Sequence, residues 1–106
     1  MNPKNNSDIR SIVDADKIIH EPARVVILSL LNAVECMDFV FLMDRTGLTQ
    51  GNLSSHLSKL ESAGYVEIQK TFLRRRPRTI IRISQAGHHE FMNYLKTMKG
   101  FYNSIG

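Results

Sequence analysis

Several kinds of residue are scarce in this chain of 106 residues, and each shortage excludes a class of protein. Cys36 is the single cysteine, so the chain can form no internal disulfide and has no thiolate cluster for a zinc ion. No apolar run approaches the roughly 20 residues that cross a bilayer. The N-terminal stretch MNPKNNSD lacks the apolar segment of a secretory signal. We therefore expect a cytoplasmic protein with no membrane partner.

Sequence patterns of common active sites are also missing. The chain has no glycine-rich phosphate loop, no nucleophile motif and no HExxH. His88 and His89 are adjacent, so on a helix they point about 100° apart and do not suit one metal ion. His20 and His56 have no cysteine or carboxylate at ligand spacing. We expect no enzyme, no metal site and no cofactor, and we interpret Cys36 as a small buried residue.

Acidic residues are scarce in the second half of the chain. Residues 1–48 carry 5 basic and 7 acidic side chains, whereas residues 49–106 carry 9 basic and 3 acidic ones. The net charge of the second half is therefore +6, although the whole chain carries +4. This asymmetry favours a polyanionic partner for the second half.

The organisation along the chain is that of one small domain. Residues 1–7 are polar and predict a disordered tail, and residues 8–106 predict a single domain. Isoleucines and valines in residues 9–19 suggest helical turns, with Asp14 or Asp16 as the N-cap. Pro22 suits a first helical position, so a helix is expected from there to about Asn32. Its many apolar side chains predict that it is buried on most sides.

The next segment predicts a helix-turn-helix. Asp38 is a plausible cap for a short helix from Phe39 to Arg45, which Gly47 ends in a left-handed conformation. Thr49 then caps a third helix from about Gln50 to Ala63, and the turn between the two is about four residues long. Val40 and Phe41 fall off the apolar face of the short helix. They indicate either a second subunit or ligand, or a helix rotated from the expected position.

The third helix has two contrasting faces. Its leucines recur at helical spacing and predict a buried stripe, whereas the opposite face is short, polar and nearly uncharged. Amides suit adenine edges and serines suit phosphates, so this face favours contact with the DNA major groove. An ordinary surface helix would show a similar pattern, so the helix is weak evidence alone. The expected DNA-contacting residues are Thr49, Gln50, Gly51, Asn52, Ser54, Ser55 and Lys59.

A basic hairpin follows this helix. Residues 65–72 and 79–83 alternate between apolar and polar side chains, which predicts two strands joined by a loop at residues 73–78. Six of the 14 basic residues lie at this hairpin, and Glu67 is the single acid between Ser62 and His89. A solvated loop is the alternative to a polyanion contact. The expected DNA-contacting residues of the hairpin are Lys70, Arg74, Arg75, Arg76 and Arg78.

A last helix is expected after Ser84, which suits an N-cap. Its apolar residues recur at spacings of 4, 3, 4 and 3, which is typical of a seam between two helices. The seam predicts a homodimer interface, with packing against the chain's own first helix as the alternative; surplus apolar residues such as Met92, Tyr94 and Phe101 favour the dimer. The expected interface residues are Phe91, Leu95, Met98, Tyr102 and Ile105.

Three segments resemble a known family: HEPARVVILSLL, GLTQGNLSSHLSKLESAGYVEIQKTF and RRPRTIIRISQAGHHEF. Over roughly residues 14–98 the chain is similar to winged helix-turn-helix transcriptional regulators of the MarR and ArsR groups. The resemblance implies a homodimer on a pseudo-palindromic site. In ArsR-like relatives the positions matching Gln50, Gly51, Ser54 and Ser55 contact DNA, and the wing matching residues 74–78 contacts the backbone or minor groove. The terminal helices of such small regulators form the dimer.

Two departures from the family pattern bear on ligands. Metal-sensing ArsR proteins carry paired cysteines or histidine–carboxylate sets, which this chain lacks. MarR proteins are longer, with more helix around a ligand pocket, so a small-molecule effector is neither indicated nor excluded.

The predicted fold is therefore α+β and mainly α, a winged helix-turn-helix with a three-helix core, a two-stranded wing and a C-terminal dimerisation helix. The predicted function is a homodimeric, sequence-specific regulator that binds double-stranded DNA, with a repressor expected. The alternative is a winged-helix module that binds protein and has no specific DNA binding.

Overall fold

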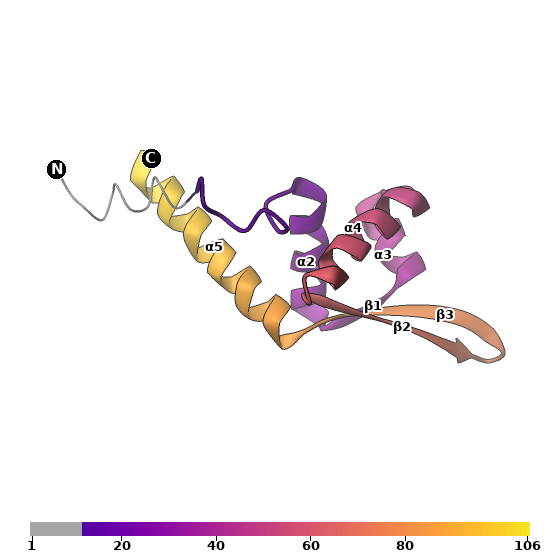
Figure 1. Ribbon diagram of the computed structural model, residues 1–106. Helices are drawn as coiled ribbons and strands as arrows, with labels where there is room; N and C mark the ends of the chain where they lie inside the picture. The colour runs from indigo at the N-terminus through magenta and orange to yellow at the C-terminus, as the bar shows by residue number, and fades with distance from the viewer. Residues whose placement is uncertain (1–11) are drawn as a thin grey trace.

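The computed structural model describes residues 12–106 (Figure 1). The predicted disordered tail at residues 1–7 lies outside the described residues, as does Ile9. Four helices and one three-stranded antiparallel sheet make up the described part, which is mainly helical, as predicted. In chain order the elements are α2 (Pro22–Val34), β1 (Cys36–Asp38), α3 (Phe39–Thr46), α4 (Gln50–Ser62), β2 (Val66–Leu73), β3 (Arg76–Ile83) and α5 (Gln85–Ile105).

The segment before α2 differs from the prediction. Residues 12–20 form turns instead of a helix. Asp16 accepts hydrogen bonds from the N–H groups of Ile18 and Ile19, so it closes a turn and does not cap a helix. Glu21 is the N-cap of α2, and its carboxylate accepts from the N–H of Arg24 at 3.0 Å. Pro22 occupies the first helical turn, as predicted.

The helix-turn-helix forms within one residue of the predicted boundaries. Asp38 caps α3, and its carboxylate accepts from the N–H of Val40 at 2.8 Å. Gly47 ends that helix with φ +71°, a left-handed conformation that glycine adopts without steric cost. The hydroxyl of Thr49 accepts from the N–H of Asn52 at 3.2 Å and starts α4. Local capping chemistry therefore determines the turn.

The sheet contains a strand that the sequence did not predict. Its strand order is β1-β3-β2, and the three-residue strand β1 pairs with β3 from Asp38 opposite Ile80 to Cys36 opposite Arg82. A strand this short has too few residues to show alternation. Its pairing becomes visible only when the chain is folded.

The hairpin is longer than predicted, and its loop is shorter. Leu73 pairs with Arg76, so Arg74 and Arg75 alone form the turn, and the six-residue loop expected at residues 73–78 is wrong. Pro77 was expected in the loop but lies within β3, opposite Phe72. A proline is tolerated there because it lies beyond the end of β1, where β3 has a neighbour on one side only.

One hydrophobic core joins the helices to one face of the sheet. Its side chains come from α2, α3, α4, both long strands and α5, together with Ile19 from the preceding turns. The helix α2 is less enclosed than expected, since Val26 is 46% exposed and Val34 is 52% exposed. The largest fully buried side chains are Ile19, Ile27, Leu28, Leu31, Leu42, Leu53, Leu57, Leu60, Ile81 and Phe91.

The start of α5 is held tightly against the segment before β2. Ser84 caps α5, as predicted, and its hydroxyl also donates to the carbonyl of Gly64 at 2.6 Å. The N–H of Ser84 donates to the carbonyl of Tyr65 at 3.0 Å. Gly87 is buried, and a Cβ added there would lie 2.0 Å from that same carbonyl oxygen. From this point α5 leads away from the domain, on the side opposite the hairpin (Figure 1).

Candidate nucleic-acid interface

The helix α4 presents a polar face because its apolar face is buried. Leu53 and Leu60 are fully buried and Leu57 is 2% exposed, so the predicted leucine stripe packs into the core. The residues expected to contact DNA are all exposed: Thr49, Gln50, Gly51, Asn52, Ser54, Ser55 and Lys59. Near its N-terminus this face carries amides, hydroxyls and free backbone N–H groups, which suit phosphates and base edges.

A polar cluster fixes α4 against the N-terminal end of α2. The buried guanidinium of Arg24 donates through Nε to the carbonyl of Ile18 at 2.6 Å. Its Nη1 lies 3.3 Å from Nδ1 of His56 on α4, and the carboxylate of Glu21 lies 3.7 Å from the same nitrogen. Sequence patterns did not indicate this cluster, because contacting members such as Glu21 and His56 lie 35 positions apart along the chain.

The turns before α2 are tied in the same way to α5 and to the start of β2. Nδ1 of His20 lies 2.6 Å from the hydroxyl of Tyr94 on α5. The hydroxyl of Tyr65 donates to the carboxylate of Asp16. Burial is the main cause that raises the pKa of Tyr65, and this hydrogen bond raises it further. Burial also raises the pKa of Tyr94. His20 and His56 therefore both form contacts within the fold.

The register of the hairpin shows which wing residues share a face with α4. Cross-strand partners point to the same side of a sheet, and side chains alternate along each strand. Ile68 and Ile81 are such partners and pack toward the core, so Lys70 and its partner Thr79 lie on that side too. A shallow depression bounded by Gln50, Ser54 and Ser58 of α4 includes Lys70 and Thr79. The polar face of α4 and the wing are therefore contiguous.

The arginines of the hairpin are not equivalent. Nη1 of Arg78 lies 3.1 Å from the carboxylate of Asp38, which links the outer half of β3 to the N-terminus of α3. Burial alone would raise the pKa of Asp38. The hydrogen bonds from Arg78 and from the N–H groups of Val40 and Phe41 outweigh it, and the pKa lies below its ordinary value of 3.8.

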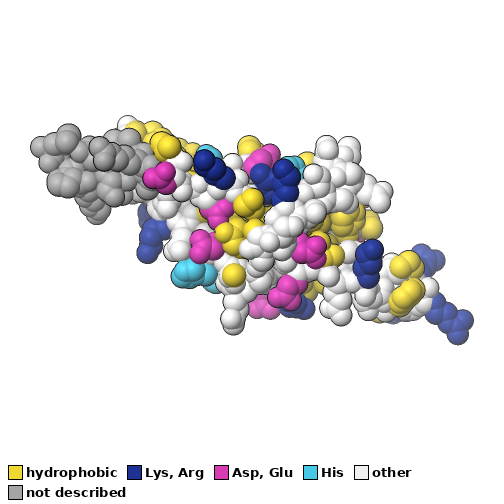
Figure 2. Space-filling model, in the orientation of Figure 1, with side chains coloured by type: hydrophobic (Ala, Val, Ile, Leu, Met, Phe, Trp, Pro, Cys, Tyr) yellow, Lys and Arg dark blue, Asp and Glu magenta, His cyan; other side chains and the backbone are white. Residues whose placement is uncertain are grey.

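Three arginines at the end of the wing remain available to a partner. Arg74, Arg75 and Arg76 are exposed, and none of them forms an ion pair with any other residue between 12 and 106. On the face shown in Figure 2, basic and hydrophobic side chains lie side by side at this end, and no acidic side chain is visible there. The charge expected at the wing is thus concentrated at its tip.

The tip itself holds an unusual backbone. Arg74 has φ +53° and Arg75 has φ +68°, so both central residues of the turn are left-handed. Two-residue hairpin turns of this kind favour Asn-Gly, because other residues are strained there. Strained residues are often retained at functional sites, which makes the two arginines candidates for a functional role.

The predicted seam on α5 divides in two. Phe91 is 2% exposed and belongs to the core, and Tyr94, which was counted as surplus apolar surface, is 7% exposed. Leu95, Tyr102 and Ile105 are exposed and Met98 is half-buried. A cleft of about 430 Å³ separates this part of α5 from His20, Pro22 and Val25. Phe91 is therefore unavailable to a second subunit, whereas the remaining four residues are accessible.

Two further searches bear on other classes of site. Across residues 12–106, no three histidine, cysteine or carboxylate side chains gather closely enough to hold a metal ion. No helix in this range is both long enough and apolar enough to span a bilayer.

Comparison with known proteins places the chain in a family. The model of the winged helix DNA-binding domain matches residues 23–102. The uncharacterized protein MJ0432 of Methanocaldococcus jannaschii is 43% identical over 79 residues, which cover 74% of this chain and 86% of MJ0432.

Solved structures agree with this assignment. A transcriptional regulator homologue from Pyrococcus horikoshii OT3 has a TM-score of 0.86 and 28% identity, over 93% of this chain and 97% of that one. A MarR family regulator from Silicibacter pomeroyi has a TM-score of 0.65 and 19% identity, over 97% of this chain and 67% of that one. Regulators of both the MarR and ArsR families share the fold, so the predicted resemblance is confirmed. The chain belongs to the winged helix DNA-binding domain family, whose fold is that of transcriptional regulators.

Proposed function

We propose that this protein is a homodimeric, sequence-specific regulator of transcription that binds double-stranded DNA, and we expect it to act as a repressor. The observation that supports the proposal most is the shared surface of α4 and the wing. A polar and nearly uncharged helix face continues through Lys70 and Thr79 into an unpaired arginine tip. A major groove accepts the helix, and the adjacent minor groove accepts the wing.

Each part of this surface has a distinct task in the proposal. Gln50 and Asn52 contact base edges, because their amides can both donate to and accept from adenine. Ser54 and Ser55 donate to phosphates, and Gly51 lets the helix approach closely. Lys70 and the arginines of the tip contact the backbone, whereas Arg78 is partly neutralised by Asp38.

The exposed part of α5 provides the dimer interface in this proposal. Leu95 is 40% exposed, Tyr102 is 60% exposed and Ile105 is 61% exposed, and an apolar cleft lies beside them. A partner helix packed in the cleft would remove this surface from water. Leu95→Glu combined with Tyr102→Glu should give monomers in sedimentation equilibrium, and the same experiment on the unmodified chain should give dimers.

Selection of bound sites from a random duplex pool tests the central claim. We expect enrichment of a site with two related halves whose centres are about 10 base pairs, or a multiple of that, apart. Gln50→Ala or Asn52→Ala should then change the preferred bases, because these side chains contact base edges. A pool that shows no enrichment would contradict sequence-specific binding.

Binding to another protein is a second candidate function, and one observation favours it. Val40 is 63% exposed and Phe41 is 50% exposed on α3, so the apolar surface expected there is present. A gel shift with random duplex DNA at low salt separates the two functions. No shift at micromolar protein would favour the protein-binding module. The expected cytoplasmic location stays a prediction under either function.

A further inference from the structure

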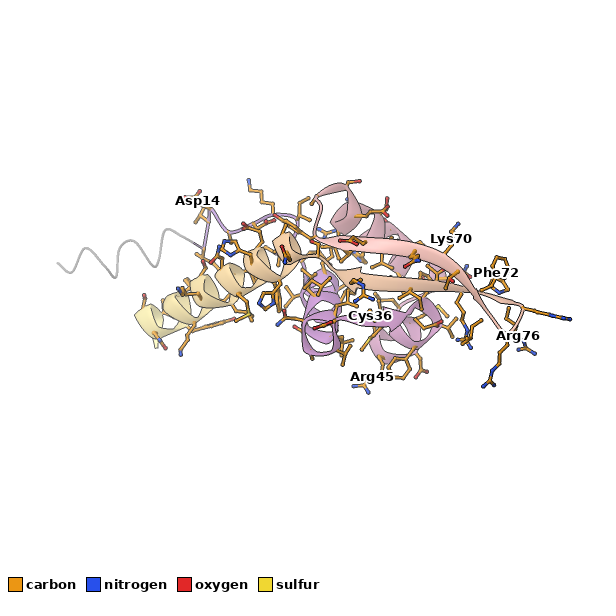
Figure 3. All side chains as sticks on the ribbon, turned by 90° about the horizontal axis from the view of Figure 1, so that it is seen from below. Asp14, Cys36, Arg45, Lys70, Phe72 and Arg76 are labelled. Atoms are coloured by element: carbon orange, nitrogen blue, oxygen red, sulfur yellow. The ribbon has the colours of Figure 1, made fainter. Side chains whose placement is uncertain are left out.

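An apolar pair lies next to the arginine tip of the wing. Phe72 is 74% exposed, and its cross-strand partner Pro77 is also exposed. Figure 3 shows Lys70, Phe72 and Arg76 following one another toward the end of the hairpin. Exposing an aromatic ring to water is unfavourable, so the position of this ring at the end of a wing suggests that a partner covers it.

The face on which the pair lies follows from the register. Ile68 with Ile81, Lys70 with Thr79, and Phe72 with Pro77 are successive partners on one side of the hairpin. This is the side that faces α4 near the core, since Lys70 and Thr79 border the same depression as Gln50. Leu73 and its partner Arg76 point to the opposite side. Phe72 and Pro77 therefore extend the surface that α4 presents.

The charges around the pair identify its partner as a polyanion with apolar patches. Lys70 lies two residues before Phe72, and Arg74 and Arg75 lie two and three residues after it. All three cations are exposed, and within residues 12–106 none of them forms an ion pair. An apolar protein partner would have to carry matching acids around its own patch. The wall of a DNA minor groove combines phosphates with the C–H groups of deoxyribose, which fits both features.

We propose that Phe72 and Pro77 pack against the deoxyribose wall of the minor groove entered by the wing, on the side next to α4. This proposal rests on the DNA-binding function proposed above and assigns to the wing an apolar contact besides its phosphate contacts. The contact adds affinity that does not depend on salt, because it releases no counterions. It also holds the tip in one register relative to the helix in the major groove.

The experiment compares three single variants with the unmodified chain on the selected duplex, at several salt concentrations. Phe72→Ala should weaken binding roughly ten-fold at every salt concentration, equivalent to about 1.4 kcal/mol. The slope of log K against log salt should not change, because no charge is lost. Arg75→Ala should instead lower that slope by about 0.9 per protomer. Leu73→Ala serves as the matched control, since it removes an apolar side chain that is 55% exposed from the other face. It should bind within two-fold of the unmodified chain.

Hydroxyl-radical footprinting provides a direct measurement, because the radical attacks deoxyribose hydrogens in the minor groove. Phe72→Ala should lose protection at the sugars beside the wing and keep protection elsewhere. Equal binding by Phe72→Ala and the unmodified chain, or an equal loss in Leu73→Ala, would overturn the assignment of this face. A second measurement places 2-aminopurine, whose fluorescence rises when the base unstacks, in the duplex beside the wing. A rise on binding would overturn packing against the groove wall, because it would show that Phe72 inserts between bases. If the unmodified chain binds no duplex, the proposed function itself fails.

Discussion

Replacement of the turn residues Arg74 and Arg75 by Asn-Gly should make the protein more stable and a weaker DNA binder. The two arginines have φ +53° and φ +68°, and they are exposed at the end of the wing. Asn and Gly adopt these angles at much lower cost, and Asn-Gly is the preferred pair for such a turn. Arg74→Asn with Arg75→Gly thus relieves strain without removing a contact inside the fold.

The size of both effects can be worked out from the turn. A left-handed residue other than glycine costs about 1–2 kcal/mol, and asparagine retains part of that cost. We expect the double variant to raise the free energy of unfolding by about 1–2 kcal/mol. Each kcal/mol corresponds to a rise of about 4–8 °C in Tm for a small domain. On DNA, two lost phosphate contacts lower the log–log salt slope by about 1.8 per protomer, and by about twice that for a dimer.

Urea unfolding and salt-dependent binding by fluorescence anisotropy measure the two effects on one preparation. The control is Arg74→Lys with Arg75→Lys, which keeps both charges and both strained positions. It should match the unmodified chain in stability and nearly match it in salt slope. A double Asn-Gly variant that is no more stable would show that the turn holds no strain. An unchanged salt slope would show that the tip contacts no phosphates.

Two further substitutions test how the fold positions this surface. Gly87→Ala should lower the free energy of unfolding by about 1–3 kcal/mol, as measured by urea unfolding. The added Cβ would lie 2.0 Å from the backbone oxygen of Tyr65, and the higher helix propensity of alanine offsets only about 1 kcal/mol of that clash. Gly51→Ala is the matched control, since no atom of the kind that Gly87 meets lies within 4 Å of its added Cβ, and it should be neutral or slightly stabilising. Equal changes in stability for the two variants would contradict the close packing of Gly87 against Tyr65. Asp38→Asn keeps a helix cap but loses the pairing with Arg78, so it should destabilise at pH 7. The pKa of Asp38 in the folded protein lies below its ordinary value. The stabilisation that ionised Asp38 gives to the fold is therefore present above pH 3.8 and is lost as the pH falls through the folded pKa. The stability difference from Asp38→Asn should therefore shrink at acid pH, and a constant difference would contradict the assignment.

Local chemistry made most helix boundaries predictable from the sequence. Asp38, Thr49 and Ser84 cap the helices that they were expected to cap, because a short polar side chain satisfies N–H groups only a few residues away. Gly47 ends α3 as expected, because glycine adopts the left-handed conformation that closes a helix. The leucine stripe of α4 was equally visible, since its spacing matches the helical period.

Contacts between distant segments explain the errors. The strand β1 exists because β3 offers it a partner 44 positions further along the chain, as in the pairing of Met37 with Ile81. Phe91 looked like one member of a uniform seam, but α5 crosses the core at its beginning and leaves it further on. Which of the seam residues are buried depends on that crossing, which helical spacing does not describe.

The order of the helices, the helix-turn-helix and the presence of a basic hairpin follow from the sequence, because caps, turn residues and periodicity act over a few positions. The tertiary structure sets how these pieces are used. It paired Arg78 with Asp38 and left three arginines at the tip available. It also placed Phe72 on the same side of the wing as the polar face of α4. The pairing of Arg78 and the position of Phe72 depend on strand register and on contacts between distant segments. The separation of two residues along the chain does not say how far apart they lie in space.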